Sequence, residues 1–503
     1  MSRYVQSETL SEILQYRAAE QPHRQFLHFE DTSFTYLECL HRARGVASAL
    51  QFHGIGRGQR VATMVTNGIN AIDLWFGCSI AGAVEVPINI ELKSNLLIDI
   101  VSRAHCELLI VEESFLEVLV PLREHLPPIL TITAFLDHAE KPVEQNNGAP
   151  EETSVILFTS GTSGPSKGVV LNHRANFRLA NAMIDNTKLT EHDVLYTTFP
   201  LFHVAARYVS VLAAMIIDGS VVVHKKFSAS QFWDICDSNG VTAIHYLGTV
   251  PMMLWNQPSR TNDPKTTVRL AYGAGMPAEV WEGFENRFNL KVFELYGSTE
   301  QGAVTMTNSE NRRVGTCGQV VEDTELEIHD QLGFKVSTNS VGEIVVRNRV
   351  SGIFFAGYLD MPDATVQSWR NLWFHTGDAG RLDEDGYLTF VGRIKDSIRR
   401  RGENISAWEL ERILDAFPAI AESAAMGVPS EIGEEEILVC VVPEHNETID
   451  PSTVWRYCEE HLPRYAIPRY LRIVESLPKT ATDKIEKYKI SILTPDTFDR
   501  TKF

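Results

Sequence analysis

From residue 61 onward, short runs of β-branched and other apolar residues alternate with longer helix-like segments. Residues 61–65, 84–88, 108–111 and 129–132 are apolar runs of strand length, and residues 71–81 are one of the helix-like segments between them. Strands that alternate with helices form βαβ units, in which helices cover the faces of a parallel sheet. The pattern predicts an α/β fold whose large N-terminal domain contains parallel-rich sheets flanked by helices.

The rhythm changes after Asp323, where short strand-like runs follow one another more closely. Residues 342–346 and 387–391 are two of these runs, and Asp-Gly at positions 385–386 is a hairpin-turn signal. We therefore expect a small antiparallel subdomain at the end of the large domain, which we place at residues 1–392.

The remainder of the chain predicts a small α+β domain. A helix is expected over residues 407–417, because Ser406 is a good N-cap residue and Glu409, three positions later, completes a capping box. We place this small, mobile C-terminal domain at residues 397–503, joined to the large domain by a hinge at residues 393–396.

Composition narrows the class of protein. The chain has 503 residues, which is more than one ordinary hydrophobic core accommodates, so we expect two or more domains. Its net charge of −19 argues against a nucleic-acid-binding surface. It contains no run of about 18 apolar residues that would span a membrane, and no apolar signal core near its first residue. Seven scattered cysteines without a CxxC pair indicate free thiols in a reducing compartment. We expect a cytoplasmic protein.

The most informative motif is Thr-Ser-Gly-Thr-Ser-Gly-Pro-Ser-Lys-Gly at residues 159–168, which follows an apolar run at 155–158. Glycines let backbone N–H groups turn toward an anion, hydroxyls add donors, and Lys167 adds a positive charge. The motif is not a Walker A loop, because Gly168 follows the lysine where that pattern requires Ser or Thr. A loop of this composition is also common as a flexible surface connection, so other motifs must decide.

Further motifs follow in a fixed order, and together they resemble the adenylate-forming superfamily of acyl- and aryl-CoA ligases, luciferases and peptide-synthetase adenylation domains. The resemblance runs from about residue 8 to residue 490 and is strongest to acyl-CoA synthetases, including carnitine/crotonobetaine-type ligases, with medium-chain and aromatic acid ligases nearby. The motifs are Phe-Pro-Leu-Phe-His at 199–203, Gly-Ala-Gly-Met-Pro at 273–277, Tyr-Gly-Ser-Thr-Glu at 296–300, Phe-His-Thr-Gly-Asp at 374–378, the run 392–405, and Lys484.

The motif at 296–300 has the chemistry of a nucleotide site. An adenine can stack on Tyr296, Thr299 can reach the α-phosphate, and Glu300 can hold Mg²⁺, which prefers carboxylate oxygen. The resemblance implies that Asp378 accepts both ribose hydroxyls and that Arg393 supports the nucleotide from the hinge side. We expect ATP or AMP to contact Thr159, Ser160, Gly161, Thr162, Ser163, Lys167, Gly273, Ala274, Gly275, Tyr296, Gly297, Ser298, Asp378 and Arg393.

The resemblance also assigns residues to the two chemical steps. It implies that His203 lines the carboxylate end of the acyl pocket and that Lys484 is the catalytic lysine, with Thr299 beside it. Asp483 stands where the family has glycine, which puts the efficiency of the first step in question. The hinge is expected at Lys395.

Gly402 and Arg401 are expected in the CoA tunnel, within a basic stretch at 398–402. The acidic residues 431–436 are interpreted as a solvated loop.

Two residues are candidates for the acyl pocket, Arg207 and Gly302. Arg207 lies four positions after His203, so an α-helix would place both on one face and direct an arginine at the acid. Such an arginine would favour an acid with a second anionic or strongly polar group. The alternative is an arginine that pairs elsewhere.

The predicted function is ATP-dependent carboxylate–CoA ligation with Mg²⁺, in which an acyl-adenylate forms and CoA then displaces AMP. No protein nucleophile is required, because positioning and charge stabilisation carry this chemistry. A rival is an enzyme that loads a separate carrier protein, and another is a non-catalytic nucleotide-binding module. The expected partners are a small carboxylic acid, aryl or acyl, and CoA; a homodimer is left open.

Overall fold

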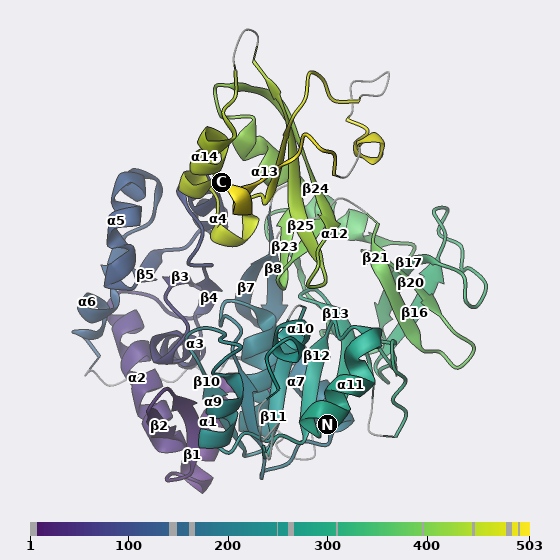
Figure 1. The fold of residues 1–503 in the computed structure, drawn as a ribbon. Helices are drawn as coiled ribbons and strands as arrows, with labels where there is room; N and C mark the ends of the chain where they lie inside the picture. The colour runs from purple at the N-terminus through teal and green to yellow at the C-terminus, as the bar shows by residue number, and fades with distance from the viewer. Residues whose placement is uncertain are drawn as a thin grey trace.

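The computed structural model describes most of the chain, and Figure 1 shows its arrangement. A large body holds the N-terminal and central segments, and the C-terminal segment (yellow-green in Figure 1) caps it at one end. The described residues are 8–139, 148–159, 166–248, 250–259, 266–307, 310–394, 397–444, 448–478, 485–490 and 493–503.

The first sheet is built around parallel strands and has the order β18-β8-β7-β4-β3-β5-β6. Strands β4, β3, β5 and β6 are parallel to their neighbours, whereas β7 and β8 form an antiparallel hairpin that frames the phosphate-loop motif. Its strands are β3 (Arg60–Met64), β4 (Val84–Pro87), β5 (Leu108–Val111), β6 (Ile129–Thr131), β7 (Thr153–Thr159), β8 (Lys167–Asn172) and β18 (Gly357–Tyr358).

The second sheet has the order β15-β14-β13-β12-β11-β9-β10-β1-β2, and its central strands are parallel. Antiparallel strands complete it at both edges. Its strands are β1 (Gln25–Phe29), β2 (Thr32–Thr35), β9 (Val194–Thr197), β10 (Ser220–Val223), β11 (Ala243–Leu247), β12 (Leu270–Ala274), β13 (Lys291–Ser298), β14 (Gly302–Met306) and β15 (Gln319–Val320).

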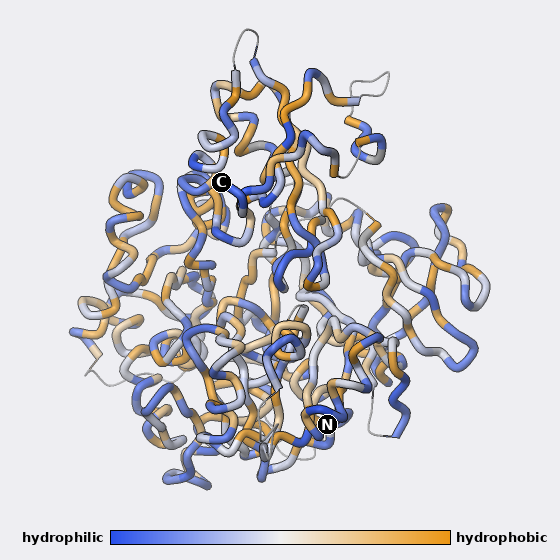
Figure 2. The backbone as a smooth tube through the Cα atoms, viewed as in Figure 1, coloured by the Kyte–Doolittle hydropathy of each residue, from blue (hydrophilic) through white to orange (hydrophobic). Residues whose placement is uncertain are grey.

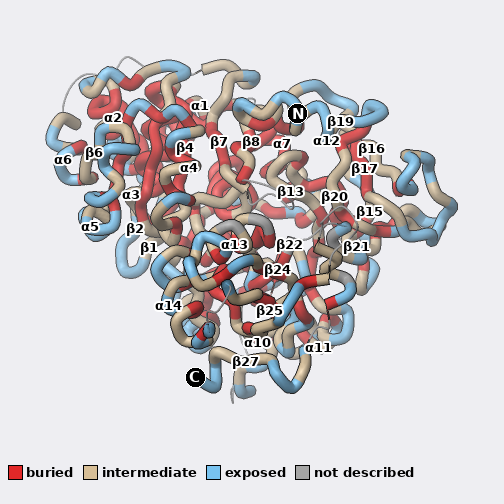
Figure 3. The backbone as a smooth tube through the Cα atoms, turned by 90° about the horizontal axis from the view of Figure 1, so that it is seen from above, coloured by how far each residue is buried: buried red, intermediate tan, exposed pale blue. Residues whose placement is uncertain are grey.

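A shared hydrophobic core lies between these two sheets and contains one set of helices. Leu108 and Ile110 of β5 face this inner core, whereas Leu109 and Val111 face the outer side, as the period of two in a strand requires. Figures 2 and 3 show apolar, buried chain along the strands and the helices between them. These helices are α1 (Leu10–Glu20), α2 (Tyr36–Phe52), α3 (Ile69–Ala81), α6 (Ile132–Leu136), α7 (His173–Thr187), a π-helix (Ala205–Leu212) and α8 (Ala213–Ile216).

Other helices cover the outer faces of the two sheets, so the predicted α/β fold is confirmed. The first sheet carries α4 and α5, and the second carries α9, α10 and α11. The outer elements are α4 (Ser94–Ala104), α5 (Leu116–Leu119), α9 (Phe232–Ser238), α10 (Val250–Trp255) and α11 (Ala278–Phe288), with 3-10 turns at Glu113–Phe115 and Val120–His125. Helix α12 (Pro362–Ser368) instead packs beside β18, with Ala364 against the inner core.

An antiparallel sheet follows, as predicted, and lies at the side of the large body. The Asp-Gly at 385–386 forms the turn between its last two strands, β20 and β21. Its strands are β16 (Thr324–His329), β17 (Gly342–Asn348), β19 (Trp369–Arg370), β20 (Trp373–Leu382) and β21 (Leu388–Arg393).

The C-terminal segment has hydrophobic cores of its own, formed by a sheet and two helices. A separate hairpin, β22 with β23, projects from it toward the large body. Its elements are β22 (Ser397–Arg400), β23 (Glu403–Ser406), α13 (Ala407–Leu414), β24 (Ile420–Pro429), β25 (Glu435–Pro443), α14 (Pro451–His461), β26 (Tyr470–Ile473) and β27 (Phe498–Asp499), with 3-10 turns at Arg464–Ala466, Lys487–Lys489 and Arg500–Lys502.

Helix α13 begins where the sequence predicts, with Ser406 as its N-cap, and ends three residues earlier than expected, at Leu414. The Ser406 hydroxyl accepts a hydrogen bond from the backbone N–H of Glu409 at 3.3 Å, which is one half of the predicted capping box. Across the described part of the chain, no helix is long and apolar enough to cross a membrane.

Candidate active site

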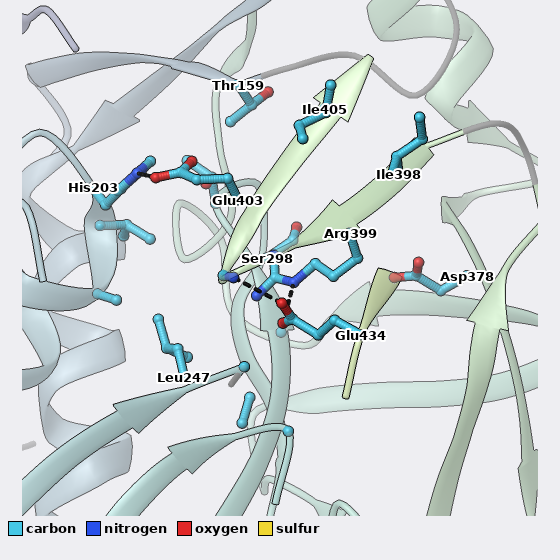
Figure 4. A pocket seen from close by; sticks show the side chains of 18 of the residues that line it. Thr159, His203, Leu247, Ser298, Asp378, Ile398, Arg399, Glu403, Ile405 and Glu434 are labelled. Carbon is cyan, nitrogen blue, oxygen red and sulfur yellow. Dashed lines mark hydrogen bonds and ion pairs between the residues drawn. The ribbon is translucent and has the colours of Figure 1, made fainter. Parts of the chain in front are cut away.

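A cavity of about 1780 Å³ lies between the large body and the C-terminal segment. Strands β11, β12 and β13 of the second sheet end at it, and the hairpin β22–β23 enters it from the opposite side (Figure 4). The sequence-predicted residues that line it are Thr159, Lys167, His203, Ala274, Gly275, Tyr296, Gly297, Ser298, Thr299, Glu300, Gly302, Asp378, Arg401 and Gly402.

The structure joins two of the predicted nucleotide-binding residues directly. The phenol of Tyr296, at the end of β13, donates a 2.6 Å hydrogen bond to Oδ2 of Asp378, on β20. The Tyr296 ring also stacks at 6.0 Å on Phe390 of β21. Both residues of the hydrogen-bonded pair are almost fully buried, so the aromatic ring and the carboxylate form one fixed surface at the cavity wall.

Glu300 has the surroundings of a magnesium ligand. Its Oε1 accepts a 3.0 Å hydrogen bond from the Tyr358 phenol, and its Oε2 accepts a 2.7 Å hydrogen bond from the Ser298 hydroxyl. The Lys167 ammonium lies 4.8 Å from the centre of the Tyr358 ring, on the same side of the cavity. Mg²⁺ is commonly held by one carboxylate together with substrate phosphates, and an oriented carboxylate beside the phosphate-loop lysine fits that mode.

The backbone geometry around the predicted adenine site requires glycine at positions 273 and 275. A Cβ at Gly273 would lie 1.8 Å from the carbonyl oxygen of Tyr246, so β12 and β11 approach too closely there for any other residue. Gly275 has φ +94° and its N–H donates to the Glu294 carboxylate. Met276 donates its N–H to the same carboxylate at 3.2 Å.

Glu294 was not expected from the sequence, although an acidic residue in the apolar strand Val-Phe-Glu-Leu-Tyr was a usable signal. It is fully enclosed, and burial raises the pKa of its carboxyl to about 7 despite hydrogen bonds from Tyr246, Gly275 and Met276 that lower it. The Glu294 carboxylate therefore fixes the turn after β12 by accepting hydrogen bonds from the N–H groups of Gly275 and Met276.

His203 contacts the C-terminal segment. Its Nε2 lies 2.9 Å from Oε1 of Glu403, on β23, and Figure 4 shows the two side chains pointing at each other across the cavity. Burial alone would raise the pKa of the Glu403 carboxyl, but His203 and then Arg399 outweigh it and hold that pKa below its ordinary value. The contact ties the Phe-Pro-Leu-Phe-His motif to the hairpin.

The acidic stretch 431–436 corrects one prediction, because its last residues are not a solvated loop. Oε2 of Glu434 accepts a 2.9 Å hydrogen bond from the N–H of Gly402, and Oε1 accepts one of 3.3 Å from Nε of Arg399. Glu436 is buried and pairs with Arg400 at 2.6 Å. These carboxylates hold the basic hairpin turn, where Gly402 adopts φ +85°.

Arg207 corrects the prediction of an arginine in the acyl pocket. Its guanidinium is 1% exposed and is paired with Glu85 of β4, with NH1–Oε2 at 2.5 Å and NH2–Oε1 at 3.0 Å. Its Nε donates to the carbonyl of Leu201, and Arg207 is not among the described residues that line the cavity. The local helix is a π-helix, so the α-helical spacing that paired Arg207 with His203 does not apply.

Gly302 lines the cavity, with φ +63°, and a Cβ there would lie 3.4 Å from the guanidinium of Arg178. The backbone of Arg393 pairs with that of Asp378 between β21 and β20. Several predicted residues lie outside the described part of the chain: Ser160, Gly161, Thr162, Ser163, Lys395 and Lys484, together with Asp483.

Comparison with known proteins places the chain in a family. The family model "AMP-binding enzyme" matches residues 14–359, and the model "AMP-binding enzyme C-terminal domain" matches residues 409–484. The crotonobetaine/carnitine–CoA ligase of Salmonella arizonae is 29% identical over 477 residues, which are 90% of this chain and 92% of that ligase.

Solved structures show the same fold. The o-succinylbenzoate CoA synthetase of Bacillus subtilis, as a double mutant with the product analogue OSB-NCoA, aligns with a TM-score of 0.87 at 24% identity, over 97% of this chain and 99% of that one. The same synthetase in complex with AMP aligns with a TM-score of 0.70 at 24% identity, over 96% and 98%. The family predicted from the motifs is confirmed: the chain belongs to the AMP-binding enzymes, in their branch of adenylate-forming acyl-CoA ligases that use ATP, Mg²⁺ and CoA.

Proposed function

We propose that this ligase activates a small carboxylic acid as its adenylate and transfers the acyl group to CoA within the single cavity described above. The observation that carries the proposal is the meeting of two sets of residues. The nucleotide-site residues Tyr296, Asp378 and Glu300 line the same cavity as Gly402 and Arg401 of the hairpin β22–β23. One cavity can therefore hold the adenylate and admit a thiol.

In the first step, an oxygen of the acid attacks the α-phosphorus of ATP and pyrophosphate departs. Tyr296 and Asp378 would fix adenine and ribose, and Thr299 with Lys484 would orient the carboxylate and the α-phosphate. Mg²⁺ held at Glu300 would supply positive charge to the phosphates. Stabilisation of developing charge by preorganised donors is the main source of rate in such a site.

In the second step, the CoA thiol attacks the adenylate carbonyl, and AMP leaves. The position of the C-terminal segment supports an arrangement suited to this step, because the hairpin turn at Gly402 lies in the cavity. The better superposition on the synthetase with a CoA product analogue than on the same synthetase with AMP also supports it. A hinge at residues 393–396, with Lys395 as its pivot, would allow Lys484 to replace the hairpin for the first step.

The acid is proposed to be small and to need no second anionic group. Two buried arginines lie near the predicted pocket residues, and each is paired with a carboxylate: Arg207 with Glu85, and Arg178, beside Gly302, with Asp323. Apolar residues such as Phe199, Val209 and Leu247 line this side of the cavity. The relatives include ligases of carnitine-type acids and structures of aryl-acid ligases, so both acyl and aryl acids belong in a screen.

All seven cysteines are free, which supports a reducing compartment such as the cytoplasm.

The test is pyrophosphate release measured over a library of aliphatic and aromatic acids, with and without CoA. We expect release that depends on one class of acid, and an acyl-CoA product detected by mass. Formation of an acylated carrier protein instead of acyl-CoA would favour the rival acceptor. Absence of release with every acid would leave only a nucleotide-binding module, and equilibrium binding of ATP would then measure it.

A further inference from the structure

Glu409, in the first turn of α13, makes a contact that crosses from the C-terminal segment to the phosphate loop. Its Oε1 accepts two hydrogen bonds from Ser166, one from the backbone N–H and one from the hydroxyl, both at 2.6 Å. Ser166 directly precedes Lys167 in the phosphate-loop motif. The carboxylate therefore uses two donors of a loop whose composition predicts a triphosphate cradle.

The contact is built from both sides. The Ser166 carbonyl accepts a 2.6 Å hydrogen bond from Arg103, and Arg103 is itself held by Asp99 at 2.6 Å. Burial raises the pKa of the Glu409 carboxyl, and the hydrogen bonds from Ser166 oppose that rise. Ser166 is 7% exposed. The contact between Glu409 and Ser166 is therefore enclosed, and neighbouring side chains hold Ser166 in place. A pairing of two exposed side chains would not have these features.

A carboxylate and a phosphate oxygen are both anionic acceptors, and one N–H group cannot serve both at full strength. In the same arrangement the C-terminal segment brings Glu403 to His203 of the large body, and within the segment Glu434 accepts a hydrogen bond from Gly402 at the cavity. Three carboxylates thus face a cavity that must hold the triphosphate of ATP before the first step. Like charges in an enclosed site repel strongly, so this arrangement suits the enzyme after pyrophosphate has left.

The geometry points to Glu409 as an internal anion that replaces pyrophosphate on Ser166 and thereby makes the thioester-forming arrangement depend on pyrophosphate release. This inference rests on the proposed two-step function and adds a positioning residue to it. When ATP occupies the loop, the Glu409 carboxylate has an alternative site at the start of its own helix, where the predicted capping box with Ser406 would take it. Glu409 then favours the adenylate-forming arrangement before the first step and the thioester-forming arrangement after it.

Equilibrium binding of inorganic pyrophosphate with Mg²⁺ tests the competition without any turnover. In Glu409→Ala the Ser166 donors have no internal acceptor, so pyrophosphate should bind roughly tenfold tighter, the value of about one charge-assisted hydrogen bond. Glu409→Gln keeps an acceptor oxygen but no charge, and it should lie between Glu409→Ala and the parent. Glu460→Gln removes an exposed acid of α14 and should bind pyrophosphate as the parent does.

The half-reactions supply the second readout. With preformed acyl-adenylate and CoA, pyrophosphate should inhibit thioester formation in Glu409→Ala at roughly one tenth of the concentration that the parent requires. Ser166→Ala should reduce the difference between the parent and Glu409→Ala, because the two residues share the contact. Folded Glu409 variants, judged by parental thermal unfolding, with parental pyrophosphate affinity would overturn the inference. Failure of the parent to form any adenylate would instead contradict the proposed function.

Discussion

Tyr296 and Asp378 are 82 positions apart in the chain, and a 2.6 Å hydrogen bond from the phenol to the carboxylate joins them at the cavity wall. The bond links the second parallel-rich sheet, through β13, to the antiparallel sheet, through β20. A carboxylate that must accept two ribose hydroxyls needs a fixed orientation, and a tyrosine beneath an adenine can provide it without adding charge.

Tyr296→Phe should therefore weaken nucleotide binding more than it slows chemistry. The variant leaves the buried Asp378 carboxylate without one donor, and a hydrogen bond to a charged group contributes about 1.5–3 kcal/mol, so affinity for ATP should fall roughly ten- to hundredfold. The measurement is KM for ATP and Kd for AMP. Tyr16→Phe, at an exposed tyrosine of α1, is the matched control. Unchanged AMP affinity would remove Asp378 from the ribose site.

Glu294 predicts a dependence of stability on pH. Its pKa is about 7 in the folded protein against an ordinary 4.5, so the folded state binds more protons than the unfolded state between these values. Stability should then fall as pH rises through this window, by about 3 kcal/mol in total, and stay level above it. Glu294→Gln should flatten this part of the profile, measured as the urea midpoint of the large domain. A parental slope in the variant would show that Glu294 does not titrate there.

The buried pair Arg207–Glu85 predicts a stability effect without a specificity effect. Removal of one partner leaves an uncompensated buried charge and should cost about 3–5 kcal/mol, whereas the double variant Arg207→Met with Glu85→Gln should cost much less than the two single losses together. Chemical denaturation of all three variants measures this. Relative rates over the acid library should be parental in each variant that folds, and a changed acid preference would return Arg207 to the pocket.

The predicted site residues show which features of the site can be predicted from sequence patterns and which cannot. That Tyr296, Glu300 and Asp378 lie at one cavity was predictable, because they stand in short motifs that resemble those of one family in order; their roles toward the nucleotide stay predictions. Arg207 was misplaced because its partner Glu85 is 122 positions away and because periodicity assumed an α-helix where a π-helix forms. Local pattern carries no information on either point.

The contacts of the C-terminal segment could not be predicted for a different reason. Glu409 belongs to a segment that was correctly predicted as a helix start, whereas Glu434 belongs to the acidic stretch that was predicted to be a solvated loop. Glu409 meets Ser166 only because the C-terminal segment docks on the large body, whereas Glu434 meets Arg399 and Gly402 because distant parts of that same segment pack together. A rigid-body position is set by the sum of many distant contacts, and no short spacing in the chain records it.

Lys484→Ala should separate the two half-reactions. A positioned cation on the carboxylate and the α-phosphate acts as a preorganised electrostatic group, and its loss should slow adenylation by roughly 10²–10³. Thioester formation from preformed acyl-adenylate should remain close to parental, because the hairpin β22–β23 lines the cavity in the arrangement that we propose for that step. Lys479→Ala is the control for a nearby lysine. Equal loss in both half-reactions would contradict the assignment.

The contact between His203 and Glu403 predicts coupling that appears in one half-reaction only. The 2.9 Å approach joins the large body to the hairpin β22–β23, so it exists when the hairpin is in the cavity. A double-mutant cycle with His203→Ala and Glu403→Gln should give an interaction energy of about 0.5–3 kcal/mol in the rate of thioester formation from preformed acyl-adenylate.

In the pyrophosphate-releasing half-reaction the same cycle should give an interaction energy within about 0.5 kcal/mol of zero, because the hinge rotation that we propose would bring Lys484 to ATP and carry Glu403 away from His203. His203→Ala alone is still expected to slow adenylation, since His203 is predicted to line the acid site in both arrangements. Glu403→Gln alone should leave pyrophosphate release nearly parental. Equal coupling in both half-reactions would mean that the hairpin stays in the cavity throughout the cycle, and the two-arrangement account of this ligase would then fail.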